Sequence, residues 1–105
     1  MIIQGTTPTH TFNLPFDSEN IKRARFVYSQ AGVVKIIKDS TDTDTAVTLD
    51  EGKASTTLAQ ADTFNLDPDV VVELVLRLLT ANDTAMETKP VYMVCKGSAD
   101  KEVLT

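Results

Sequence analysis

The stretch that decides the fold is residues 70–80, which read Val-Val-Val-Glu-Leu-Val-Leu-Arg-Leu-Leu-Thr. Every second residue from Val70 is apolar, which would give an extended strand one fully apolar face. Three consecutive valines also favour a strand, because β-branched side chains lose rotamer freedom in a helix. The pattern therefore predicts a central strand. The side chains expected to face inward are Val70, Val72, Leu74, Leu76 and Leu78.

A helix over the same residues is the alternative. Asp67-Pro68-Asp69 would supply an N-cap and a proline at the first helical position, and Glu73 and Arg77 would pair on one helix face. In the strand, which we favour, these two residues share the second, mixed face. That face would either contact a partner protein or be covered by a second sheet or a loop. The candidate interaction face consists of Val71, Glu73, Val75, Arg77 and Leu79.

Length and composition predict one globular domain over residues 1–105. The chain is 42% hydrophobic and 24% charged, as in ordinary globular proteins, and its formal net charge is −5. An acidic balance argues against binding to nucleic acid or to an anionic membrane surface, since phosphate groups are bound by clustered Lys and Arg. The one basic cluster, Lys22, Arg23 and Arg25, is expected to be the solvated face of a strand.

Nothing in the sequence indicates secretion or membrane insertion. The single cysteine, Cys95, cannot form an intrachain disulfide, so the chain gives no sign of an oxidising compartment. The opening residues lack the basic and apolar regions of a signal peptide, and no apolar run reaches the ~20 residues that cross a bilayer. We expect cytoplasmic synthesis.

Short apolar alternations bounded by turn residues recur along the rest of the chain. They predict strands over 9–16, 21–30, 33–38, 46–49, 54–58 and 86–95, in addition to 70–80. Pro90 should cause a bulge in the last strand or place it at an edge. Residues 58–63 lose the alternation, which predicts one helical turn between two sheets, and 96–105 should form a loose tail. The fold class is therefore all-β: a seven-stranded antiparallel immunoglobulin-like β-sandwich with one short helical turn.

Residues that could carry chemistry are few. His10 and Cys95, the single histidine and cysteine, both lie in apolar alternation, so we expect no catalytic site and no metal or cofactor held by them. The tyrosines and phenylalanines are likewise expected in the core. The best candidates for a cation are the acids of the loops between 39 and 51, because calcium prefers several oxygen ligands from flexible loops. These acids are Asp39, Asp42, Asp44, Asp50 and Glu51.

The opening, Ile-Ile-Gln-Gly-Thr-Thr-Pro-Thr-His-Thr-Phe over residues 2–12, resembles that of small uncharacterised proteins encoded in phage and prophage regions. The similarity continues through Ile21-Lys22, Arg25 and Tyr28 to residues 58–63, and it weakens after residue 80. The resemblance implies a virion-associated or accessory role, in the tail or baseplate for example, and it supplies no catalytic residues.

These observations together predict a non-enzymatic structural or protein–protein interaction module. Its partner would be a second copy of itself or a phage structural protein, and it would act without nucleic acid, membrane or cofactor. The alternative function is a domain for calcium-dependent or carbohydrate surface recognition that uses the loops from Asp39 to Glu51.

Overall fold

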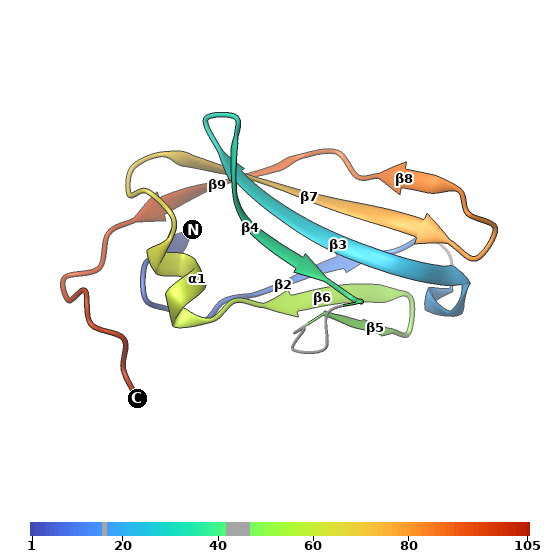
Figure 1. Cartoon of the computed structure of the whole chain (residues 1–105), viewed down its shortest axis with the longest axis horizontal. Helices are drawn as coiled ribbons and strands as arrows, with labels where there is room; N and C mark the ends of the chain where they lie inside the picture. Colours follow the sequence, from blue (N-terminus) through green and yellow to red (C-terminus); the bar gives the residue numbers. More distant parts are fainter. Residues whose placement is uncertain (16, 42–46) are drawn as a thin grey trace.

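The computed structural model describes residues 1–15, 17–41 and 47–105. Within them the protein is all-β, with two sheets packed face to face (Figure 1). The larger sheet has the order β1 (Ile2–Ile3), β9 (Val91–Lys96), β7 (Val71–Thr80), β3 (Ile21–Gln30) and β4 (Val33–Asp39), with β8 (Ala85–Glu87) paired to the far end of β7. The smaller sheet has the order β2 (Thr9–Asn13), β6 (Lys53–Thr57) and β5 (Thr48–Asp50).

The central strand was predicted correctly. β7 pairs with β3 along one side and with β9 and β8 along the other. Its side chains alternate between the core and the opposite face, which is the period-two pattern of the sequence. The buried positions within β7 are Val72, Leu74, Leu76 and Leu78. The helical alternative for this segment is therefore wrong.

Aromatic side chains connect the two sheets. Phe26 and Tyr28 of β3 are fully buried, and they meet the half-buried side chains of β2. The rings of Phe12 and Phe26 pack edge to face with centroids 5.8 Å apart. His10 Nδ1 and the Tyr28 hydroxyl lie 2.6 Å apart in a hydrogen bond. The alternation in 9–16 and 21–30 thus predicted which faces form the core; Phe16 lies outside the described residues.

Two-residue turns close the hairpins that the sequence predicted. Ala31 and Gly32 join β3 to β4, and Glu51 and Gly52 join β5 to β6; all four have positive φ angles. Such turns match the twist of paired strands. Ala46, the first residue of the strand predicted over 46–49, lies outside the described residues.

The predicted helical turn is present as α1 (Gln60–Phe64). It follows β6 of the smaller sheet and precedes β7 of the larger one, so it carries the chain between layers, as expected (Figure 1). The Asp62 carboxylate accepts a hydrogen bond from the Ala59 N–H, which helps to begin the helix. A short 3₁₀ turn, η1 (Ser18–Asn20), lies in another crossing between the sheets, from β2 to β3.

The strand predicted over 86–95 is broken in two near Pro90. Arg77 faces Glu87 whereas Leu74 faces Val91, so the returning chain has one extra residue between the two pairings. Thr88 bridges the break: its N–H donates to the Leu76 carbonyl, and its hydroxyl accepts from the Leu76 N–H. The prediction of a bulge is therefore confirmed, and the expectation of one continuous strand was wrong.

The strand count and the purely antiparallel arrangement need correction. The described residues form nine strands rather than seven, because β8 and β9 are separate and β1 was not predicted. β1 pairs with β9 in parallel, with Ile2 opposite Cys95. A two-residue strand is too short to show a period in the sequence. Ile2 is nevertheless fully buried.

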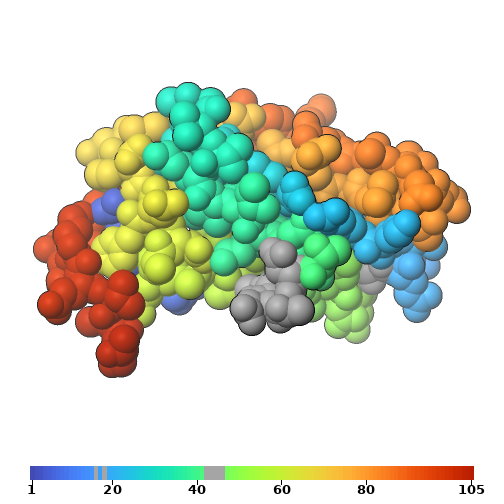
Figure 2. All heavy atoms as spheres, in the orientation of Figure 1, coloured from blue at the N-terminus to red at the C-terminus, as the bar shows by residue number. Residues whose placement is uncertain are grey.

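The segment after β9 contains no helix or strand, but it is attached to the domain. The backbone of Leu104 makes two hydrogen bonds with the Gln60 side chain, and Lys101 Nζ donates to the Gln4 side chain. Figure 2 shows this segment, in red, beside the yellow α1 region. The predicted tail is thus irregular in conformation and held at two points.

The outer edge of β4 is partly covered by α1 and the residues that follow it. The Asn65 side-chain amide donates to the Lys35 carbonyl at 2.9 Å. Lys35 and Lys38 form ion pairs with Asp67 and Asp62, at 3.3 and 2.8 Å. A side chain and two ion pairs therefore occupy part of the edge where a further strand would add.

Gly5 is expected to tolerate no side chain. Its φ angle is +80°, and an added Cβ would lie 2.7 Å from Cζ of Phe64 in α1. Gly5→Ala should therefore lower the free energy of unfolding by about 1–3 kcal/mol, through backbone strain and the displaced ring. Gly97→Ala is the matched control, since the nearest neighbour of its Cβ is the flexible end of Lys101 at 3.3 Å. Equal denaturation midpoints for the two variants would contradict this expectation.

Candidate functional site

The candidate interaction face lies on the side of β7 turned away from the smaller sheet. Val71 is 53% exposed, Arg77 is exposed, and Glu73, Val75 and Leu79 are half-buried. The core, including the side chains of the smaller sheet, packs against the opposite face of β7. The sequence left open whether these residues contact a partner protein or are covered by a second sheet or a loop. Among the residues that the structure describes, the second sheet does not cover them.

Neighbouring strands extend this face in both directions. Val27 of β3 lies opposite both Val75 and Ile37 of β4, and Val94 of β9 lies opposite Val71. Since residues opposite one another share a sheet face, two apolar rows lie on this side of the larger sheet, Ile37-Val27-Val75 and Val71-Val94, with the row of Ser29, Glu73 and Tyr92 between them. We call the outward side of β4, β3, β7 and β9 the outer face. Its well-exposed apolar residues are Val34, Ile37, Val71, Tyr92 and Val94.

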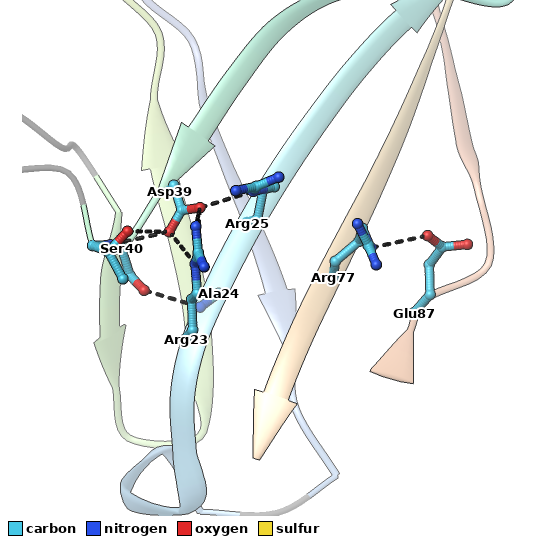
Figure 3. A network of polar contacts seen from close by, with 8 residues as sticks. Arg23, Ala24, Arg25, Asp39, Ser40, Arg77 and Glu87 are labelled. Atoms are coloured by element: carbon cyan, nitrogen blue, oxygen red, sulfur yellow. Dashed lines mark hydrogen bonds and ion pairs between the residues drawn. The ribbon is translucent and has the colours of Figure 1, made fainter. Parts of the chain in front are cut away.

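Charged side chains form a row across one end of the outer face. In the strand register Asp39, Arg25, Arg77 and Glu87 are consecutive neighbours on β4, β3, β7 and β8. Figure 3 shows the ion pairs at the two ends of this row, Asp39 with Arg25 at 2.8 Å and Arg77 with Glu87 at 3.6 Å. In the middle of the row the two arginines are directly opposite each other, an arrangement that costs electrostatic energy.

Asp39 is the best-connected acid of the described residues. Its carboxylate accepts hydrogen bonds from Arg23 Nη2 at 2.6 Å, from Arg25 Nε at 2.8 Å and from the Thr41 N–H at 3.1 Å. The Arg23 guanidinium, with help from Thr41 and Arg25, holds the pKa of Asp39 well below its usual value although burial acts in the opposite direction. The side chain is 3% exposed. Asp39 therefore anchors β4 to β3.

A pocket of about 210 Å³ lies beside this row. Three arginines, Arg23, Arg25 and Arg77, line it together with the apolar side chains of Leu79 and Met86. The predicted solvated cluster of Lys22, Arg23 and Arg25 is thus divided. Lys22 pairs with Asp83 at the surface, while the arginines belong to the outer face.

The acids proposed for calcium do not form one group in the described residues. The Asp39 carboxylate is hydrogen-bonded to two arginines, whereas Asp50 and Glu51 lie at the β5–β6 turn. Asp42 and Asp44 lie outside the described residues. Within 1–15, 17–41 and 47–105 there is no cluster of three potential metal ligands. Calcium-dependent recognition by these loops stays a prediction, which a calcium titration followed by melting temperature would test.

Cys95 lies in the packed interior, and His10 is half-buried on β2, where it is hydrogen-bonded to Tyr28. Burial lowers the pKa of His10 and raises that of its partner Tyr28. Burial also raises the pKa of the Cys95 thiol, which reduces the thiolate available at neutral pH. Both side chains pack against the core, as their apolar neighbours in the sequence indicated.

Tyr92 corrects the expectation that the aromatic side chains belong to the core. It is 65% exposed on the outer face, opposite Glu73. In residues 91–95 every side chain is apolar or aromatic, so alternation could not distinguish the inward from the outward positions. The contribution of β9 to the outer face was therefore not predictable from that segment alone.

Comparison of the chain with protein-family models, curated proteins and solved structures gave no match. Among the described residues no helix has the length and apolar character needed to cross a bilayer.

Proposed function

We propose that the protein is a non-enzymatic protein–protein interaction module that binds its partner through the outer face. The observation that carries this proposal is the pair of apolar rows, Ile37-Val27-Val75 and Val71-Val94, on a sheet side that the smaller sheet does not cover among the described residues. Exposed apolar surface interspersed with and rimmed by charged residues is typical of protein-binding sites.

We infer in addition that the two sheets have an immunoglobulin-like arrangement of the variable type. In support, strands β9-β7-β3-β4 and β2-β6-β5 follow the orders G-F-C-C′ and B-E-D when the strands are lettered along the chain. In this arrangement fully buried Tyr28, on the strand lettered C, would take the part of the tryptophan that antibody domains bury on that strand. β1 departs from the arrangement described for constant domains, since it joins β9 and not the smaller sheet.

The biological setting proposed for this module is a phage or prophage, with a tail or baseplate protein, or a second copy of the chain, as the partner. Its support is the resemblance of the opening, residues 2–12, together with the segments around Arg25 and Tyr28 and residues 58–63. Within the structure, much of that opening forms β1, which pairs with β9 at the edge of the larger sheet, β2 of the smaller sheet and the connection between them.

The test compares two valines of similar exposure, Val71 at 53% and Val103 at 50%. Val71→Lys places a charge in an apolar row of the outer face, and Val103→Lys places the same charge in the C-terminal segment. Tagged protein is used to capture partners from a phage lysate, and the captured proteins are identified by mass spectrometry. Val71→Lys, but not Val103→Lys, should reduce the amount of captured partner by at least about tenfold, because burying an unpaired charge costs more than ~1.4 kcal/mol.

Unchanged melting temperatures would establish that both variants are folded. If Val71→Lys retained the partner as well as Val103→Lys does, the outer face would not be the binding surface.

A further inference from the structure

The apolar and charged side chains on the outward side of β7 follow one another in an order that is symmetric about Val75. Around Val75 the chain reads apolar, acidic, apolar, basic, apolar: Val71, Glu73, Val75, Arg77 and Leu79. A two-fold axis that passes above Val75, parallel to the sheet and perpendicular to β7, would bring each residue opposite its mirror position on a second, facing copy. It would place Glu73 against Arg77 of a second copy, and Val71 against Leu79 of that copy. The face is therefore complementary to itself.

The charges on this face have incomplete partners within one chain. Glu73 is half-buried, lies between Ser29 and Tyr92 in the register, and has no ion pair among the residues the structure describes. Arg77 has a partner in Glu87, but at 3.6 Å and with both side chains more than half exposed, an arrangement that contributes little. Arg77 also faces Arg25 directly. A carboxylate that approached from above the sheet would relieve this repulsion.

We infer that the partner of the outer face is a second copy of this chain, packed face to face about a two-fold axis at Val75, with Glu73 of each copy bound by Arg77 of the other. This inference rests on the proposed function and names its partner.

The dimensions of the face suit such a dimer. Four strands about 4.8 Å apart, and ten residues of about 3.4 Å along β7, give a projected area of roughly 600 Å². A stable interface buries about 800 Å² of accessible surface on each partner, and accessible area exceeds projected area where side chains protrude. Two twisted sheets that pack face to face cross at about 30°, so contacts concentrate near the axis at Val75.

The experiment uses charge reversal and recombination. Sedimentation equilibrium of the wild-type chain, up to about 1 mM, should show a dimer. E73R and R77E should each be monomeric at concentrations where the wild type is dimeric, since each variant places like charges opposite one another across the axis. An equimolar mixture of E73R and R77E should form a 1:1 dimer, and the double variant should dimerise with itself.

E102R is the matched control, because Glu102 is exposed in the C-terminal segment and its reversal should leave the dimer unchanged. Dichroism and melting temperature establish that each variant is folded. A monomeric wild type, single variants that still dimerise, or a mixture that stays monomeric would each overturn the inference. If the wild type is monomeric but Val71→Lys abolishes capture of another protein, only the second copy is ruled out and the proposed function stands.

Discussion

Replacing Leu76 by alanine is expected to lower the free energy of unfolding by about 3–5 kcal/mol. Leu76 is fully buried at the middle of β7, between the two sheets. The loss combines the transfer free energy of the removed carbons with the cost of the cavity that remains, since β7 is paired on both sides and cannot collapse into the space. For a domain of this size most of the total stability would be lost.

Leu104→Ala is the control of the same residue type. Leu104 is 71% exposed and is held through its backbone, so its side chain should contribute less than about 0.5 kcal/mol. Urea denaturation of both variants, compared at equal slope, measures the difference. A Leu76→Ala chain as stable as Leu104→Ala would show that β7 does not form the core in the way described.

Asp39→Asn should be the most destabilising change of a polar residue, by about 2–3 kcal/mol. The carboxylate is almost fully buried and binds two arginines, so the substitution leaves Arg23 and Arg25 without their shared counter-charge. The cost stays below that of a deeply buried pair because the arginine side chains are 42% and 35% exposed and can be hydrated. Asp83→Asn, which breaks the exposed Lys22 pair, should cost under about 1 kcal/mol.

The pH dependence of stability supplies the second measurement on Asp39. The folded state lowers the pKa of this carboxyl from 3.8, so the unfolded chain binds its proton first as the pH falls. The stability that Asp39 contributes is therefore complete above pH 3.8 and is lost as the pH falls through that value toward the pKa of the folded state. The stability difference between wild type and Asp39→Asn should shrink below about pH 4. A difference independent of pH would contradict the ion-pair origin.

Much of the fold was predictable because its strands carry a clear period. β2, β3 and β7 alternate over five or more residues, and the burial of each follows that alternation. The loss of alternation near Gln60 likewise predicted α1. β1 was missed because two residues show no period, although Ile2 is buried through a pairing with the distant Cys95. Such pairing depends on the whole chain.

The candidate site was predictable in its centre and not in its extent. The mixed face of β7 follows from one segment of sequence, whereas the neighbours of Arg77 depend on which strands pair and in which register. Arg25 was expected to be a solvated side chain, and Asp39 a loop acid. Only the register of β3 with β4 and β7 places both in the row of charges that ends at Glu87.

The side-chain amide of Asn65 on the Lys35 carbonyl has a consequence for assembly. β4 carries exposed Val33, Val34 and Ile37, the kind of apolar strand that recruits identical strands into open-ended fibres. Because the Asn65 side chain already occupies part of the β4 edge, the addition of further strands at that edge is hindered. Packing of another molecule on the face of the larger sheet is not hindered by this contact. If copies of the chain associate as proposed, the occupied β4 edge favours closed complexes of defined size over polymers that grow from this strand.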